Sequence, residues 1–254
     1  MRLLVLGAQD TGLLAAARAR GLFVTAVDPE ASAPGFRLAQ RRAILPLDDE
    51  PALERLVEAG HADGVLGTDS PTTAVAARIA SRFGLRHPLS PEAAVLASSQ
   101  LRQRTKLAEA QIPQTRWAVL RGHAVPAFPC VVGAPDRKGR RLAEEAPSGA
   151  EVTVTAFSHE GVFEPLLGSG RPAELARRAA QALGVRDGIT STRLRLGVDG
   201  PRVASLRAHA GAREVELCRL LLGVDVHGLV LEAALGRNRS AEDVRFGSAD
   251  AQVA

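Results

Sequence analysis

Aromatic side chains are scarce in this chain, because they make up 3% of its 254 residues and tyrosine is absent. Proteins that bind single-stranded nucleic acids use aromatic rings as stacking platforms in addition to positive charge. The sequence pI is about 9.9, but the net charge of +4 is small and the arginines are spread along the chain. The composition therefore predicts a solvated, arginine-rich surface and no nucleic-acid partner.

Long apolar runs are also missing, since no stretch approaches the roughly 20 residues that a membrane-spanning helix needs. The amino terminus reaches Gly7 too soon for the apolar core of a signal peptide. We therefore expect no membrane association and a cytoplasmic location. The two cysteines, Cys130 and Cys218, both have apolar neighbours, so we expect buried free thiols with no disulfide and no metal site.

Lysine is nearly absent, because Lys106 and Lys138 are the two lysines and arginine supplies thirty of the 32 basic residues. Chemistry that needs two separate lysines therefore has few candidates. What the chain does contain is 46% hydrophobic residues, over a length sufficient for one large or two modest domains with buried cores.

The first third of the chain alternates apolar strands with amphipathic helices. Strands are expected at residues 2–7, 22–27, 43–47 and 63–67, and helices at 11–20, 51–59 and 70–84. This alternation predicts an α/β unit with a Rossmann-like parallel sheet, whose ligands lie beyond the carboxyl ends of the strands. The candidate substrate-binding residues at that edge are Gly7, Gly12, Asp28, Thr68, Asp69 and Ser70.

The first turn, residues 7–12, nearly matches a dinucleotide-binding fingerprint, and Asp28 ends the second strand where a ribose-binding acid would stand. However, Gln9 takes the place of the glycine that lets the backbone approach a pyrophosphate. The turn therefore favours tight helix packing over dinucleotide binding.

The next segment carries a family resemblance. Residues 98–115 and the strand at 117–120 are similar to the entry of ATP-grasp ligases, in which a helix reading roughly Asp-Lys-x-x-x-Arg-x-x-Leu-x-x-Ala-Gly-Ile-Pro precedes the nucleotide domain. Upstream, Asp28-Pro29, residues 64–66 and Thr68-Asp69 resemble the pre-ATP-grasp domain of carbamoyl-phosphate-synthase-like and amino-acid-ligase-like members. The order of segments carries the match, since no single short motif is diagnostic.

The resemblance continues, less closely, to about residue 236. It covers the strand at 128–133, the acidic segment 144–154, the strand at 199–211 and the helix that ends at Gly236. It implies a Rossmann-like pre-ATP-grasp domain at 1–90, a helical connection at 91–125, and a shortened ATP-grasp-like α+β domain at 126–236. A polar tail is expected at 237–254, and the carboxyl-terminal lobe of the family is expected to be missing.

ATP-grasp ligases phosphorylate a carboxylate with ATP, using cations on the phosphates and acids that hold magnesium. This chain departs from the family at those points. Ser99-Gln100 replaces the Asp-Lys pair, Gly133 replaces the strand lysine, and the glycine-rich flap is cut short. On the metal strand, Ser205 and Arg207 stand where glutamate and asparagine bind magnesium, so ATP and magnesium are doubtful cofactors and we predict no metal site.

A few residues have side chains that suit the binding and catalytic roles that the resemblance implies. Candidate cofactor-binding residues are Arg102, Lys138, Glu144 and Glu151, and candidate catalytic residues are His209 and Arg207. Each has a plainer interpretation as well: the basic loop 136–141 is typical of a solvated turn, and glutamates that flank a Pro-Ser-Gly turn are commonly exposed. A lone strand histidine is more often structural.

Three functional interpretations stay open at this point. The first is a degenerate ATP-grasp homologue with weak or no ligase activity, which binds a small carboxylate, an amino acid or a partner protein. The second is an active ATP-dependent carboxylate–amine ligase with substituted phosphate-binding cations, and the third is a Rossmann-type nucleotide-binding protein. A homo-oligomer, or a partner subunit that supplies the missing groups, also stays open.

Overall fold

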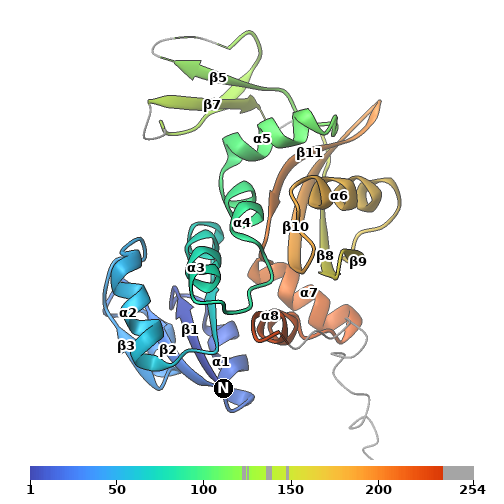
Figure 1. The fold of residues 1–254 in the computed structure, drawn as a ribbon. Helices are drawn as coiled ribbons and strands as arrows, with labels where there is room; N and C mark the ends of the chain where they lie inside the picture. Colours follow the sequence, from blue (N-terminus) through green and yellow to red (C-terminus); the bar gives the residue numbers. More distant parts are fainter. Residues whose placement is uncertain (122–123, 125, 136–138, 147–148, 237–254) are drawn as a thin grey trace, which may run out of the picture.

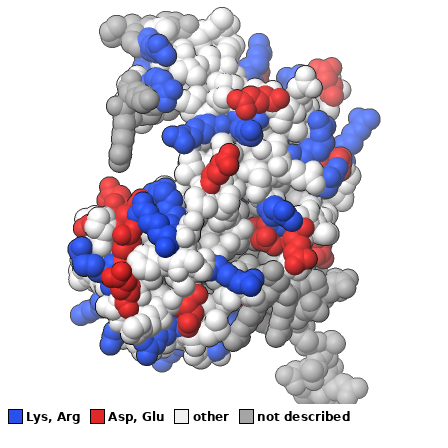
Figure 2. Space-filling model, viewed as in Figure 1, with Lys and Arg blue, Asp and Glu red and all other residues white. Residues whose placement is uncertain are grey.

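The computed structural model describes residues 1–236, apart from 122–123, 125, 136–138 and 147–148 (Figure 1). Lys138 and the expected polar tail lie outside the described residues. No helix in the described part is both long enough and apolar enough to cross a membrane. Positive and negative side chains are interspersed on the face that Figure 2 shows, as a solvated surface requires.

The amino-terminal unit is a parallel sheet with the strand order β3-β2-β1-β4, which confirms the predicted Rossmann-like sheet. Its elements are β1 (Arg2–Leu6), α1 (Thr11–Ala19), β2 (Phe23–Val27), the 3-10 helix η1 (Pro34–Arg37), β3 (Arg41–Ala43), α2 (Glu50–Gly60), β4 (Gly64–Gly67) and α3 (Ser70–Arg82). Each α-helix of this unit begins at an aspartate whose side chain accepts a backbone N–H, so the sequence itself sets these starts.

The predicted strand at 43–47 is wrong, because β3 occupies Arg41–Ala43 instead. Pro46 has no N–H to donate to a ladder, which disfavours a strand through this position. Leu45 and Leu47 lie outside the strands, and they pack against the core between the sheet and helices α2 and α3. The apolar residues in the run 43–47 therefore predicted burial correctly, but they predicted the position of the strand incorrectly.

Two helices, α4 (Pro91–Ser98) and α5 (Gln100–Glu109), connect the amino-terminal unit to two antiparallel sheets (Figure 1). The smaller sheet has the order β5-β7-β6, and the larger one has the order β11-β10-β8-β9. Their elements are β5 (Trp117–Arg121), β6 (Cys130–Val132), β7 (Arg140–Glu145), β8 (Glu151–His159), β9 (Val162–Leu167), α6 (Gly170–Ala182), β10 (Gly188–Gly197) and β11 (Gly200–Arg207). Helix α6 packs its alanine-rich side on one face of the larger sheet.

The last two helices, α7 (Ala212–Leu222) and α8 (Val226–Ala234), tie the two halves together. Leu231 and Ala234 of α8 lie in one core with Leu3 and Val5 of β1. At the start of α8, Arg20 of α1 forms an ion pair with Asp225. The final helix thus contributes to the amino-terminal core, although it follows the larger antiparallel sheet in sequence.

Both cysteines are free, as expected. Cys218 is fully buried, and burial raises the pKa of its thiol to about 11. Cys130 is only half-buried, so the expectation of burial is wrong for this residue, because it begins β6, an edge strand of the smaller sheet.

Candidate functional site

We compare four cavities that the described residues line. One of about 420 Å³ sits at the carboxyl ends of β1, β2 and β4, and one of about 310 Å³ lies between the α4–α5 junction and β10–β11. A third, of about 290 Å³, separates the smaller from the larger antiparallel sheet. The fourth is a small cavity of about 60 Å³ between β4, β10 and α8.

The amino-terminal cavity is rimmed by carboxylates that already have structural partners. Asp28 is 3% exposed and accepts the backbone N–H groups of Ala8 and Glu30, at 2.8 and 2.9 Å. Asp10 accepts from the first turn of α1, and Asp69 accepts from the first turn of α3. These acids therefore hold turns and helix starts in place, and their charge disfavours a polyphosphate at this edge.

The structure brings together four of the six predicted substrate-binding residues. Those that line the amino-terminal cavity are Gly7, Asp28, Thr68 and Asp69. Gly7 has φ +96°, and a Cβ there would lie 2.2 Å from Thr68 Oγ1, so this turn requires glycine. Ser70 lines the neighbouring cavity, whereas Gly12 packs against His227, whose Cε1 would lie 2.5 Å from an added Cβ.

His209 lies just beyond β11, at the contact between the two halves. Its Nδ1 is 3.4 Å from Ser70 Oγ. Burial, and then the positive charge of Arg207, lower the pKa of His209, which favours its neutral imidazole. The contact with Ser70 is a structural role for His209. Its catalytic role stays a prediction.

Two further histidines, His87 and His227, line the small cavity beside His209, and sequence reasoning missed both. His87 Nδ1 lies 3.1 Å from the Leu89 backbone N–H, while its Nε2 is buried with no hydrogen-bond partner in the described part of the chain. Burial lowers the pKa of His87 to about 4. No local pattern marks these two residues, because tertiary packing brings them together.

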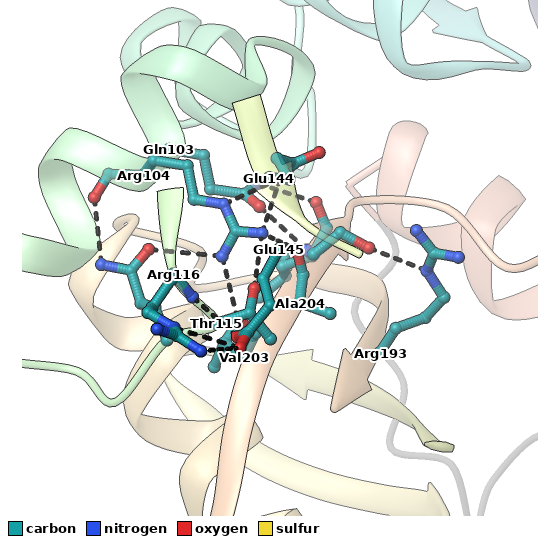
Figure 3. A network of polar contacts seen from close by, with 12 residues as sticks. Gln103, Arg104, Thr115, Arg116, Glu144, Glu145, Arg193, Val203 and Ala204 are labelled. Carbon is teal, nitrogen blue, oxygen red and sulfur yellow. Dashed lines mark hydrogen bonds and ion pairs between the residues drawn. The ribbon is translucent and has the colours of Figure 1, made fainter. Parts of the chain in front are cut away.

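The face of the larger sheet opposite α6 carries arginines and hydroxyl groups. Arg193 on β10 donates through Nε to Ser205 Oγ on β11 at 2.9 Å, as Figure 3 shows. Arg207 lies two residues further along β11 and lines the same 310 Å³ cavity. The predicted site residue Arg207 is thus placed beside Arg193, which the sequence analysis did not single out.

Arg104 is the centre of a polar network that joins α5, β7 and β11 (Figure 3). Its side chain is 3% exposed and donates twice to Glu144 Oε1, at 3.0 and 2.6 Å. It also donates to the carbonyl oxygens of Val203 and Ala204, at 2.9 and 2.5 Å. Glu144 therefore serves this network, while the predicted Arg102 is exposed and lies outside the four cavities.

The other acids between the antiparallel sheets are paired in the same way. Glu151 forms an ion pair with Arg195 at 2.7 Å, and Glu145 forms one with Arg116 at 2.9 Å. The backbone and side-chain N–H groups of Arg116 lower the pKa of Glu145. All three glutamates that line this cavity are thus neutralised by arginines.

These donors do not fit the magnesium ion that the resemblance implies. Within the described ranges, no three His, Cys, Asp or Glu side chains are grouped so that they could hold a metal ion. Gly133, at the position of the family's strand lysine, is exposed, and its backbone N–H bonds the Leu142 carbonyl at 2.9 Å. An oxygen-preferring divalent cation would meet paired carboxylates and guanidinium groups here.

No protein-family model and no curated protein matches the chain. Among solved structures, L-amino acid ligase from Bacillus licheniformis has a TM-score of 0.82 at 20% identity, over 95% of this chain and 75% of that chain. Phosphoribosylglycinamide synthetase from Anaerococcus prevotii has a TM-score of 0.76 at 18% identity, over 93% and 75%. N5-carboxyaminoimidazole ribonucleotide synthetase from Thermotoga maritima has a TM-score of 0.75 at 15% identity, over 96% and 78%. The chain therefore has a shortened ATP-grasp-like fold, which confirms the resemblance at the level of the fold.

Proposed function

We propose that this chain is a degenerate ATP-grasp homologue with weak or no magnesium-dependent ligase activity, which binds a small anionic molecule in the cleft between its sheets. The observation that carries this proposal is the pairing of every glutamate in the 290 Å³ cavity with an arginine. A carboxylate that is held by a guanidinium offers a divalent cation little, because binding the metal would break an ion pair.

The residues on the β10–β11 face support the same proposal. Ser205 and Arg207 stand where the family resemblance implies metal ligands, and Arg193 lies opposite Ser205. Two positive charges at this position repel a cation and attract an anion. The chain's own residues can therefore orient an anionic group, and they supply no acid to hold magnesium beside it.

The ligand candidates remain small carboxylates and amino acids. Acids line the amino-terminal cavity, arginines line the cavity at β10–β11, and the consecutive residues Asp69 and Ser70 line one cavity each. A molecule with an amine at one end and an anion at the other would complement both edges. Thermal-shift measurements with amino acids, using wild type and Asp69→Ala, test this placement, and identical shifts in both would remove Asp69 from the site.

A working ligase with substituted cations is the second candidate. It is favoured by the arginine content of the 290 Å³ cavity, whose lining includes Arg104, Arg193, Arg195 and Arg202. Guanidinium groups can neutralise a polyphosphate. Three of the four already have partners, however, in Glu144, Glu151 and Asp199, which weakens this interpretation.

Titration calorimetry with Mg-ATP, together with an ADP-release assay across amino-acid substrates, separates the two candidates. We expect no binding that depends on magnesium and no turnover above background. A low-micromolar dissociation constant that is lost in EDTA would overturn the proposal. In that case Arg195→Gln should weaken binding, while Arg178→Gln, a change at an exposed position of α6, should not.

A further inference from the structure

We propose that Arg193 and Arg207 form a metal-independent binding site for a phosphoryl group. The site is the 310 Å³ cavity between the α4–α5 junction and β10–β11, and the assignment rests on the proposed function because it requires that no magnesium ion occupies this face. The side-chain amide of Gln103 is bound to the Leu206 backbone. The other polar groups of the lining are hydroxyl, amide and guanidinium groups. They come from Ser70, Ser98, Gln100, Arg193, Ser205 and Arg207.

No acid balances the charge of this cavity within the described part of the chain. The described residues that line it include no aspartate or glutamate. Among the described residues, Arg207 has no hydrogen bond or ion pair, and the one bond of Arg193 is its Nε contact with Ser205. Both side chains are partly buried. A partly buried guanidinium without a counter-charge costs folding free energy, and an anion that enters the cavity would supply that charge.

The other arginines near this face differ in this respect. Arg104 and Arg195 form ion pairs with Glu144 and Glu151 at 2.6 and 2.7 Å. Their positive charges are therefore balanced by carboxylates of the protein itself. Arg193 also lines the 290 Å³ cavity, but all three glutamates there already form ion pairs with other arginines. The charges of Arg193 and Arg207 are therefore available to a ligand.

The strand register brings these two arginines within reach of one anion. Across β10–β11, Ser205 lies opposite Arg193, and Ser191 lies opposite Arg207. The two arginines are therefore diagonal neighbours on one face, about 7–8 Å apart at the backbone. Their planar guanidinium groups can both donate to a single tetrahedral dianion, which balances two positive charges, whereas one carboxylate would leave a charge over.

Two buried hydroxyl groups extend the same row. Ser191 and Thr155 lie opposite each other on β10 and β8, and they are 1% and 0% exposed. Neither side-chain oxygen has a hydrogen-bond partner within the described part of the structure. The row from Arg207 through Ser191 to Thr155 thus contains potential hydrogen-bond donors and no acid, although Ser191 and Thr155 are not among the residues that line the 310 Å³ cavity.

Titration calorimetry with inorganic pyrophosphate, in the presence of EDTA, tests the site. We expect binding that is unchanged by EDTA and that weakens at least about tenfold in Arg207→Gln and in Arg193→Gln, the loss of one charge-assisted contact. Arg207→Lys should recover only part of the affinity, because it restores the charge without the planar fork. The control Arg178→Gln removes the same charge from the outside of α6 and should bind as wild type does.

Several outcomes would overturn the site. They are binding that requires magnesium, equal weakening in Arg178→Gln, or malonate binding as tightly as pyrophosphate. A matching arm with metal-free ATP identifies the source of the phosphoryl group: tighter binding than pyrophosphate supports a nucleotide at this site, and equal binding supports a non-nucleotide phosphate ester there. Unfolding of each variant without ligand is measured in parallel, and we expect Arg207→Gln to be at least as stable as wild type.

The failure of this inference can be told apart from the failure of the proposed function. Metal-free pyrophosphate binding that weakens in Arg193→Gln and Arg207→Gln, together with Mg-ATP turnover that neither substitution changes, would leave the phosphoryl site in place and sink the degenerate interpretation. The absence of both would overturn the phosphoryl site and leave the degenerate interpretation standing.

Discussion

The carboxylates at the edge of the parallel sheet and the arginines on the β10–β11 face use their charge in opposite ways. Asp28, Asp10 and Asp69 each accept backbone N–H groups within their own unit. Arg193 and Arg207 line a cavity that has no acid among its described residues. The sequence analysis named residues in both regions.

The comparison teaches that a charged residue at the right edge of a sheet is a weak guide to binding. What distinguishes the two regions is whether the charge has an internal partner. Charges with partners stabilise local structure, whereas charges without partners raise the free energy of the folded state until a ligand arrives. Substitutions of buried, paired charges should therefore reduce stability most, and substitutions of unpaired charges should change binding instead.

Arg104 is a buried charge with several hydrogen-bond acceptors, so its loss should have a large effect on stability. Arg104→Ala leaves Glu144 and the Ala204 carbonyl without this donor, while the Val203 carbonyl keeps the Thr115 backbone N–H. We expect the free energy of unfolding to fall by about 3–4 kcal/mol. Urea denaturation followed by circular dichroism measures it. Arg102→Ala, on the exposed side of the same helix, is the matched control and should change stability by less than about 0.5 kcal/mol.

His87 should make the contact between the halves sensitive to acid. Its pKa is about 4 in the folded protein and 6.5 when unperturbed, so the unfolded chain binds the proton first as the pH falls. The stability that neutral His87 provides is complete above pH 6.5 and is lost as the pH drops toward 4, by about 3 kcal/mol in total.

The urea midpoint of wild type should therefore fall more steeply between pH 7 and pH 4 (roughly the window set by these pKa values) than that of His87→Gln. His61→Asn is the control, because His61 is exposed and left-handed and asparagine tolerates that conformation. Equal pH profiles for wild type and His87→Gln would contradict the prediction.

Asp28 and Asp69 should differ although both were predicted to bind substrate. Asp28→Ala leaves two backbone N–H groups without an acceptor in a buried turn, and we expect a loss of about 2 kcal/mol. Asp69→Ala removes a helix cap at an exposed position and should cost about 1 kcal/mol. Thermal unfolding of the two variants gives the ranking, and the reverse order would show that Asp28 is not a structural acid.

Restoring the family's metal residues should have the smallest effect. Ser205→Glu with Arg207→Asn places a new carboxylate beside Arg193, which donates to position 205 and would pair with it. We expect no magnesium-dependent ATP binding in this double variant. Adding Arg193→Ser and Gly133→Lys should yield measurable Mg-ATP affinity but no turnover in the ADP-release assay.

The steric environment permits the last of these changes, because a Cβ at Gly133 would meet only the Leu142 carbonyl, at 3.7 Å. If Gly133→Lys alone produced turnover, the departures from the family would be superficial, and the active-ligase candidate would replace the proposed function.

Local sequence determined much of the fold. The alternation of apolar strands and amphipathic helices predicted the parallel sheet. In the structure, the side chains of aspartates 10, 49 and 69 cap its helices. The order of segments also predicted the ATP-grasp-like fold, which the solved structures confirm. These features depend on residues near one another in the chain, so a sequence reader can find them.

Tertiary structure decided which charges have partners. Arg104 and Glu144 are 40 residues apart, Glu151 and Arg195 lie on different strands, and His87 meets His209 and His227 only when the two halves pack. The sequence therefore identified Arg207 as a candidate site residue and showed where the metal strand differs from the family pattern. It could not show that Arg102 is exposed while Arg104 is buried. Ion pairing depends on distances between side chains, and the folded structure sets those distances. In a chain with thirty arginines, the composition leaves many possible partners for every acid.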